Sequence, residues 1–331
     1  MGERMKKSIL SVQDLKIAFP YDGKLVTVVD SVSFDVYQGE TLGLVGESGS
    51  GKSVTSKAIL RLIEEPPGKI CGGQVRFDGK DLLKLSNKEM RQVRGGKISM
   101  IFQEPMTSLN PIYTCGNQIM ESILLHRDVD KATAKQLAID MLRLVGVQSP
   151  ETRINAYPFE LSGGMRQRVM IAMALSSQPD ILIADEPTTA LDPTIQAQIL
   201  RLIRDIQAKM GLSVLFITHD LGVVAEMCDR VAVMYAGKIV EIAPVMEIFN
   251  SPAHPYTQGL IDAVPRLDKK QDMLYSIKGS VPSFAALPKG CAFGPRCPYY
   301  SPQCEAAPPC VQMKPDWTVR CWRAAAEEKE R

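Results

Sequence analysis

The chain has 331 residues, enough for about two domains and a sizeable core, and its 45% hydrophobic and 23% charged residues are ordinary for a soluble globular protein. A net charge of +2 and an aromatic content of 6% give no sign of a nucleic-acid-binding surface, and no segment approaches the ~18 consecutive apolar residues of a membrane helix. The N-terminal MGERMKKSIL lacks an apolar signal region, so a cytoplasmic protein is expected, yet eight cysteines are many for a reducing compartment.

Short apolar runs of strand length alternate with longer segments of helical period, which predicts an α/β fold. The predicted strands are Leu15–Phe19, Thr41–Val45, Ile98–Phe102, Ile181–Ala184, Val214–Ile217 and Val231–Tyr235. The predicted helices are Ser53–Leu62, Gln118–His126, Ala132–Val145, Gly164–Ser176, Ile195–Ala208 and Leu221–Met227. Because no strand is predicted between Glu104 and Gln178, we expect residues 104–178 to form a helical subdomain inserted into the α/β core.

The C-terminal part has a different character. From about Pro265 onward, frequent prolines interrupt every potential helix, so a small appendix is expected there. The final AAAEEKER is expected to be a solvated tail. Five of the eight cysteines lie between Cys291 and Cys321, and this clustering requires an explanation.

The strongest motif follows the predicted strand Thr41–Val45. Gly46, Glu47, Ser48, Gly49, Ser50, Gly51, Lys52 and Ser53 fit the pattern G-x-x-x-x-G-K-[ST] between a strand and a helix. The glycines let successive N–H groups point inward, the helix adds the positive end of its dipole, and Lys52 reaches the β- and γ-phosphates. Ser53 is placed to bind Mg²⁺. The alternative is a glycine-rich turn before an ordinary helix, but the pattern arises by chance in only ~1% of chains of this length.

Two acidic residues follow a second buried strand. The apolar run Ile181–Ala184 is typical of a parallel strand inside a sheet, and Asp185 and Glu186 stand at its carboxyl end, where open α/β sheets bind ligands. Asp185 would hold the hydration shell of Mg²⁺, and Glu186 would orient and deprotonate an attacking water. The pair indicates nucleotide hydrolysis rather than binding alone.

Residues Leu161, Ser162, Gly163, Gly164 and Met165 resemble the LSGGQ motif of the ATP-binding cassette (ABC) ATPases, with Met165 in place of the usual glutamine. The serine and glycines open a helix whose N–H groups and dipole suit a phosphate. In this family the motif faces the γ-phosphate of ATP bound to the opposite subunit. The resemblance therefore implies that two nucleotide-binding domains enclose each ATP.

Other segments resemble the same family in the same order. Gln103 is similar to the Q-loop glutamine that touches Mg²⁺, residues 190–192 resemble the D-loop, and His219 resembles the switch histidine on the γ-phosphate. For the aromatic ring that stacks on adenine, Phe19 is the first choice and Tyr21 the alternative. The resemblance covers about residues 8–260. It implies a P-loop NTPase of ABC type, with a RecA-like mixed sheet core, an antiparallel β subdomain and an inserted helical subdomain.

The sequence after residue 250 narrows the group. Residues 254–260 (HPYTQGL), 263–267 (AVPRL) and 290–298 (GCAFGPRCP) resemble the extension of ATPase subunits from oligopeptide and dipeptide importers, a group that includes nickel importers. The resemblance implies a dimer with a second ATPase subunit or with itself, two membrane permeases, an extracytoplasmic substrate-binding protein, no nucleic acid, and a place on the cytoplasmic face of the membrane. The alternatives are a nickel or sugar importer and a soluble ABC regulator acting on nucleic acid or the ribosome.

The clustered cysteines predict a metal site in the extension, residues 261–331. Cys291, Cys297 and Cys304 are separated by five and six residues, and Cys321 follows sixteen residues later. Four thiolates in a reducing compartment suit Zn²⁺ or an iron–sulfur cluster, and the spacing alone does not decide between them. The family resemblance implies a [4Fe–4S] cluster, with zinc or no metal as the alternative. Cys310 is the additional thiol, and the remaining three cysteines are expected to be ordinary buried or loop residues.

Overall fold

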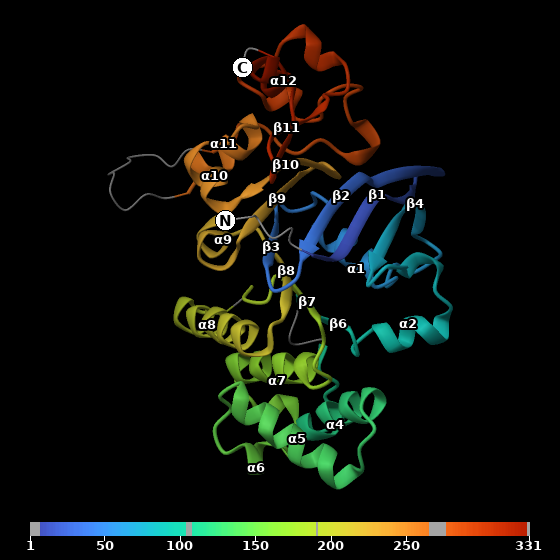
Figure 1. Cartoon of the computed structure of the whole chain (residues 1–331), viewed down its shortest axis with the longest axis vertical. Helices are drawn as coiled ribbons and strands as arrows, with labels where there is room; N and C mark the ends of the chain where they lie inside the picture. The colour runs from blue at the N-terminus through green and yellow to red at the C-terminus, as the bar shows by residue number, and fades with distance from the viewer. Residues whose placement is uncertain (1–6, 104–107, 190, 265–275, 330–331) are drawn as a thin grey trace. The chain divides into compact units, whose positions relative to one another are not determined.

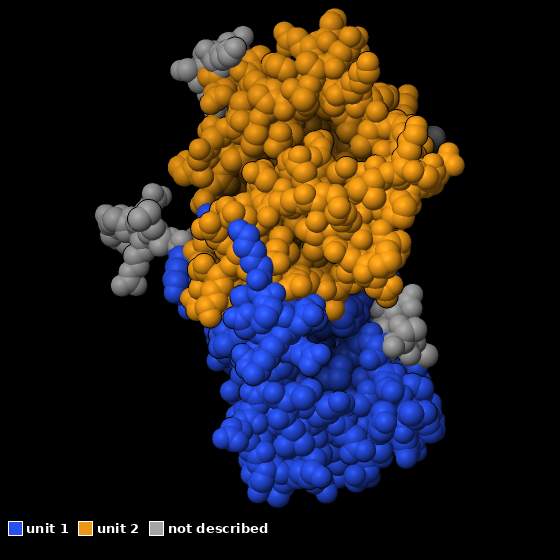
Figure 2. All heavy atoms as spheres, turned by 90° about the vertical axis from the view of Figure 1, so that its right-hand side faces the viewer, with its two compact units in different colours: residues 1–7, 37–40, 84–217 blue, residues 8–36, 41–83, 218–331 orange. Residues whose placement is uncertain are grey.

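The computed structural model describes residues 7–103, 108–189, 191–264 and 276–329, and these divide into two compact units. Unit 1 comprises residues 37–40 and 84–217 with the N-terminal end, and unit 2 comprises residues 8–36, 41–83 and 218–331 (Figure 2). The boundary residues Glu104 and Pro265, the D-loop residue Ala190, and Arg266 and Leu267 lie outside the described residues.

Unit 2 contains an antiparallel sheet and a mixed sheet. The first has the order β2-β1-β4-β5, and the second runs β11-β12-β10-β9-β3 within this unit (Figure 1). The strands are β1 Ser8–Tyr21, β2 Lys24–Tyr37, β3 Thr41–Val45, β4 Lys69–Phe77, β5 Lys80–Asp81, β9 Arg230–Tyr235, β10 Lys238–Pro244, β11 Cys310–Lys314 and β12 Trp317–Arg320. The helices are α1 Lys52–Ile59, α9 Leu221–Met227, α10 Val245–Asn250, α11 Pro255–Asp262 and α12 Trp322–Lys329. Strands β3 and β9 are parallel, whereas the pairs β9–β10, β10–β12 and β12–β11 are antiparallel.

Unit 1 combines three parallel strands with helices. Its strands are β6 Ile98–Ile101, β7 Ile181–Asp185 and β8 Ser213–Thr218, in the order β8-β7-β6. Its helices are α2 Asn87–Val93, α4 Cys115–His126, α5 Lys131–Leu144, α6 Pro150–Arg153, α7 Gly163–Leu175 and α8 Pro193–Met210. Helices α4, α5 and α7 pack on one another, and the described residues between 108 and 178 contain helices and no strand (Figure 1).

Local chemistry explains why these elements begin where they do. Every residue of β3, β7, β8 and β9 is buried, as expected for apolar runs inside a sheet. Polar caps start the helices of unit 1: the Asp130 carboxylate accepts from Thr133 N–H at α5, and the Asp192 carboxylate accepts from Ile195 N–H at α8. Within the described ranges, we find no helix with both the length and the apolar character needed to cross a bilayer.

The C-terminal AAAEEKER, predicted as a solvated tail, is exposed at residues 326–328 but is helical as far as residue 329. In this helix, α12, Ala324 and Ala325 are buried, and Arg323 forms an ion pair with Glu327 one turn later. Alanine, glutamate and lysine are strong helix formers, and two buried alanines anchor the helix on one side. The composition of these last residues therefore favours a helix, although the proline-rich sequence before them does not.

Candidate functional site

The loop between β3 and α1 has the backbone that the P-loop motif requires. Gly46 has φ of 153°, and a Cβ there would lie 2.1 Å from the Met234 carbonyl oxygen. Gly51 has φ of 104° and caps α1, and a Cβ would meet the Met234 side chain at 2.8 Å. Since only glycine fits both the conformation and the space, the motif glycines are fixed by packing against β9.

Lys52 lies inside the curve of this loop. Its side chain is buried, and Nζ donates to the carbonyl oxygens of Gly46 at 2.7 Å and Glu47 at 2.9 Å, and to Ser50 Oγ at 3.3 Å. Ser48 and Gly49 at the tip of the loop are exposed, and Ser53 is half-buried in the first turn of α1. A cation thus sits among backbone groups next to a helix N-terminus, an arrangement suited to a polyphosphate.

The two aromatic candidates for adenine stacking both lie at the end of β1. Phe19 is half-buried, and its ring is so close to Gly68 that a Cβ at that glycine would meet it at 2.8 Å. Tyr21 is 63% exposed. Of the two rings, Tyr21 is therefore the more accessible to a ligand.

In unit 1, the structure brings together two of the predicted catalytic residues. Glu186 follows the buried Asp185 at the end of β7, and its Oε2 accepts hydrogen bonds from Gln103 Nε2 at 3.0 Å and Thr189 Oγ1 at 2.9 Å. Glu186 has φ of 47°, a left-handed conformation that is uncommon for a side-chain-bearing residue and typical of functional sites. The local structure thus aims and holds the Glu186 carboxylate.

The LSGGM segment forms the beginning of α7. Ser162 is the N-cap, and its Oγ accepts from the Met165 N–H at 3.4 Å. Gly163 faces open space, whereas a Cβ on Gly164 would meet Ile195 of α8 at 2.9 Å. The first turn of α7 is therefore open at Gly163 and packed against α8 at Gly164. A helix N-terminus with open N–H groups suits a phosphate.

His219 lies in unit 2, between β8 and α9. It is exposed, and the next residue, Asp220, caps α9 by accepting from the N–H groups of Gly222 at 2.8 Å and Val223 at 3.3 Å. The segment that carries His219 is thus fixed at a helix start. His219 belongs to the same unit as the P-loop, while Gln103, Asp185, Glu186 and Ser162 belong to unit 1.

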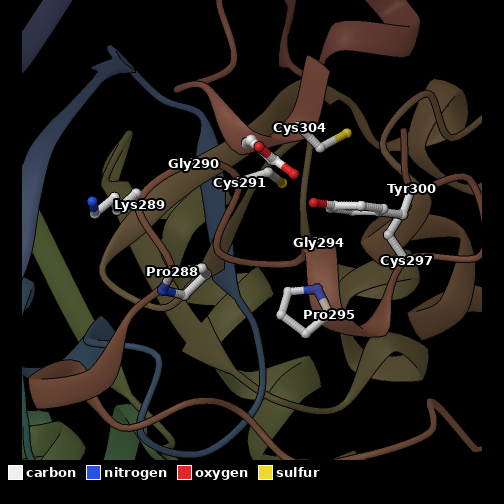
Figure 3. A pocket seen from close by; sticks show the side chains of 10 residues that line it. Pro288, Lys289, Gly290, Cys291, Gly294, Pro295, Cys297, Tyr300 and Cys304 are labelled. Atoms are coloured by element: carbon white, nitrogen blue, oxygen red, sulfur yellow. The ribbon is translucent and has the colours of Figure 1, made fainter. Parts of the chain in front are cut away.

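The four predicted metal-binding cysteines converge in unit 2. Cys291, Cys297, Cys304 and Cys321 all line one cavity of about 100 Å³, and the first three also line a cavity of about 600 Å³ (Figure 3). Burial, together with the neighbouring Cys304 and Cys321, raises the pKa of Cys291 to about 11. Burial likewise raises the pKa of Cys297 and Cys321.

Thiol donors gathered around one cavity fit the chemistry of a thiolate-bound metal. Among the described residues, however, no three His, Cys, Asp or Glu side chains are arranged closely enough to hold a metal ion. The structure therefore supports the convergence of the four thiols and gives no support for a [4Fe–4S] cluster. Cys310 is exposed outside these cavities, Cys115 and Cys228 are buried, and Cys71 is exposed on β4.

Sequence reasoning missed three residues that contact predicted site residues, and a fourth, Gln167, that contacts the residue after Glu186. Thr189 donates to Glu186, the buried Gln167 donates through Nε2 to the Pro187 carbonyl, the Tyr256 hydroxyl accepts from the Glu47 N–H, and Arg296 pairs with the Glu47 carboxylate. Tyr256 and Arg296 lie in the HPYTQGL and GCAFGPRCP segments, so the sequence had singled out the segments but not these two residues. No local pattern indicated what they contact.

Two family models match the chain: "ABC transporter" over residues 29–189 and "Oligopeptide/dipeptide transporter, C-terminal region" over residues 240–304. A probable peptide ABC transporter ATP-binding protein of Sinorhizobium fredii is 52% identical, covering 96% of this chain and 95% of the relative. The dipeptide transport ATP-binding protein DppD of Bacillus subtilis gives the same three values, and DppD of Escherichia coli is 48% identical over 93% of this chain and 94% of its own length.

Solved structures agree with these matches. A dimeric ATP-binding cassette in a post-hydrolysis state, bound to ADP and Pi, is 25% identical with a TM-score of 0.64, covering 71% of this chain and 98% of its own. The likeness confirms the predicted mixed α/β cassette fold of an ABC ATPase. With the P-loop, the acidic strand end and the LSGGM helix all in place, this chain belongs to the ABC transporter family, among its ATP-binding proteins.

Proposed function

We propose that this chain is the ATP-hydrolysing subunit that powers import of dipeptides or oligopeptides through separate membrane permeases. One observation carries the proposal: a P-loop with a buried, inward-held Lys52 and a peptide-transporter C-terminal region occur in one chain that matches dipeptide transport relatives over almost its whole length. The relatives named above are peptide or dipeptide transport proteins. They give no support to a nickel or sugar importer or to a soluble regulator.

The residues divide the work of hydrolysis as follows. Lys52 and the N–H groups of residues 48–53 bind the β- and γ-phosphates, which are the groups that carry most of the ligand's charge. Ser53, Asp185 and Gln103 would hold Mg²⁺, which neutralises charge on the phosphate oxygens when bound. Glu186, aimed by its hydrogen bonds, accepts a proton from the attacking water, and His219 contacts the γ-phosphate.

The partners follow from the same assignment. One chain has one P-loop and one LSGGM helix, so a complete site needs a second ATPase subunit, either a homologue or another copy. Ser162, Gly163 and Gly164 of each subunit would face the ATP of the other. We further propose a peripheral position on the cytoplasmic face of the membrane, two permease subunits, an extracytoplasmic substrate-binding protein, and the domain boundaries 8–260 and 261–331.

We also propose that Cys291, Cys297, Cys304 and Cys321 hold a metal, with the [4Fe–4S] cluster as the first choice. The shared cavity and the donor chemistry of four thiols support a thiolate-bound metal in general. The choice of the cluster over zinc rests on the family resemblance alone. A bound cluster would cross-link a proline-rich segment and so stabilise it. Iron, sulfide and zinc analysis of anaerobically purified protein tests this: four iron and four sulfide per chain support the cluster, one zinc identifies the alternative, and no metal refutes the proposal.

A pair of variants tests the catalytic assignment. Glu186→Gln should keep MgATP binding while hydrolysis falls by at least about a hundredfold, because the general base is lost while the phosphate-binding groups remain. Lys52→Ala should abolish nucleotide binding itself. The exposed Lys57 on the same helix provides a matched control, and Lys57→Ala should behave as wild type. Hydrolysis at the wild-type rate by Glu186→Gln, or normal ATP binding by Lys52→Ala, would contradict the assignment.

A further inference from the structure

The C-terminal segment makes an ion pair with the P-loop. Arg296 Nη1 donates to Glu47 Oε2 at 2.8 Å, and Nη2 donates to Glu47 Oε1 at 3.1 Å. The Arg296 side chain is only 6% exposed and the Glu47 side chain 28%. A two-pronged, largely buried arginine–carboxylate pair fixes both orientation and distance, unlike the mobile ion pairs of a protein surface. The second residue of the P-loop is thus held by a residue 249 positions later.

Arg296 is itself fixed in place. It ends the short turn Gly294–Arg296, and its N–H donates to the Phe293 carbonyl at 2.9 Å. Its Nε donates to the Lys278 carbonyl at 3.0 Å, and the guanidinium lies 5.8 Å from the centre of the Tyr235 ring on β9. The donors of the planar guanidinium thus reach acceptors from several segments, so the guanidinium has a defined position.

Glu47 also contacts Lys52 of the P-loop, so a restraint on Glu47 acts on the position of Lys52. Its backbone N–H donates to the Tyr256 hydroxyl at 2.9 Å, and its carbonyl oxygen accepts from Lys52 Nζ at 2.9 Å. Tyr256 on α11 is fully buried and packs against Phe293, three residues before Arg296, with ring centres 5.4 Å apart. One residue of the P-loop is thus held through its carboxylate and its N–H by the C-terminal part of the chain.

We propose that Arg296 is a positioning residue for the P-loop, through which the C-terminal segment sets the affinity for MgATP. The inference rests on the proposed ATP binding and deepens it. Without Arg296, the Glu47 carboxylate would lose the two hydrogen bonds that fix its orientation, and the loop would lose a fixed point. The loss of hydrogen bonds to a charged group is large enough to weaken binding by about tenfold.

The test measures binding of Mg²⁺ with adenylyl imidodiphosphate to the full chain, and KM and kcat for ATP in the assembled transporter. Arg296→Ala should raise Kd and KM about tenfold, while kcat changes less than about twofold, because groups that act on the reacting phosphate are untouched. Arg296→Lys keeps the charge but loses the fork, so its Kd should lie between those of wild type and Arg296→Ala. In a Glu47→Gln background, Arg296→Ala should add less than about twofold, since the two residues act as a pair.

The matched control is another ion pair between the same C-terminal part and the rest of unit 2. Lys314 Nζ forms an ion pair, at 2.5 Å, with the carboxylate of Glu247 on α10. Neither residue belongs to the P-loop, so Lys314→Ala should leave Kd unchanged. An unchanged Kd in Arg296→Ala, an equal loss in Lys314→Ala, or a full tenfold effect in the Glu47→Gln background would overturn the proposal. Should wild type itself fail to bind the nucleotide, the proposed function fails and not the positioning role alone. If Arg296→Ala does not fold, the Arg296→Lys and Glu47→Gln variants still decide the question.

Discussion

Acid should destabilise unit 2 because His254 is buried as a neutral side chain. His254 is 1% exposed, its Nδ1 accepts from the Tyr256 N–H at 3.0 Å at the start of α11, and its ring lies 5.9 Å from Phe293. Burial lowers the pKa of His254 from its usual 6.5 to about 3. A charged imidazolium would lose the hydrogen bond that Nδ1 accepts and would stand unhydrated among aromatic rings.

The size of the effect follows from the difference in proton binding. Between pH 6.5 and about 3 the unfolded chain binds a proton at His254 and the folded chain does not, so the stability from this residue is complete above pH 6.5 and is lost as the pH falls. The loss is about 1.4 kcal/mol per pH unit, hence about 1.4 kcal/mol at pH 5.5. The neighbouring Glu241 acts in the opposite direction: burial raises its pKa, so its contribution is present at low pH and is lost as the pH rises through the folded pKa.

The comparison of wild type with His254→Asn separates the two groups. Asparagine is a good N-cap residue but does not titrate, and Glu241 is present in both proteins. Urea unfolding at pH 7.5 and 5.5, followed by far-ultraviolet circular dichroism, should show wild type losing about 1.4 kcal/mol more than the variant between the two pH values. An equal loss in both proteins would refute the reasoning.

Two further substitutions probe the packing of the site. Gly46→Ala should weaken nucleotide binding at least about tenfold, because its Cβ would lie 2.1 Å from the Met234 carbonyl oxygen, whereas Gly72→Ala, in open space, should bind normally in the same titration. Gln167→Ala removes the donor to the buried Pro187 carbonyl and should cost about 1–3 kcal/mol in urea unfolding, with a lower kcat for ATP and little change in Kd. A wild-type stability for Gln167→Ala would show that this hydrogen bond does not hold the segment after Glu186.

Buried strands were predictable because their signal is local. The strand Thr41–Val45 and the helix Leu221–Met227 have the predicted bounds, and the predicted strand Ile181–Ala184 extends by one residue. In these segments the apolar run or the helical period is continuous, so packing and propensity agree. For the same reason the position of the P-loop between a strand and a helix could be predicted, and β3 and α1 flank it in the structure.

Strands with one exposed face were missed. β2 (KLVTVVDSVSFDVY) mixes polar and apolar residues, β4 contains Gly72 and Gly73, and the hairpin of β11 and β12 is short and largely polar on β11. Such segments become strands by pairing with neighbours distant in sequence: β12 pairs with β10, with Val319 opposite Glu241 and Thr318 opposite Ile242. Periodicity within a window carries no information about that pairing.

The residues of the site likewise fall into those that a local pattern could predict and those that it could not. Residues inside motifs, such as Lys52 and Glu186, could be predicted as candidates because phosphate chemistry demands a fixed local spacing. Arg296 and Tyr256 act on Glu47 through contacts across 249 and 209 residues, and no spacing rule relates them. The sequence could predict only the segments that contain these two residues, since both segments resemble the peptide-importer extension.

The C-terminal segment is integral to the unit that carries the P-loop, because each part of the unit supplies partners for buried groups of the other. Trp317 on β12 is buried and donates through Nε1 to the carboxylate of Glu241 at 2.9 Å, and Phe293 completes the aromatic cluster with Tyr235 and Tyr256. Removing residues 276–329 would leave the buried Glu241 without this donor and expose those rings to water, a cost of several kcal/mol. Arg296 lies in the turn between Cys291 and Cys297, so the residue that pairs with Glu47 of the P-loop belongs to the same short segment as two cysteines of the cavity.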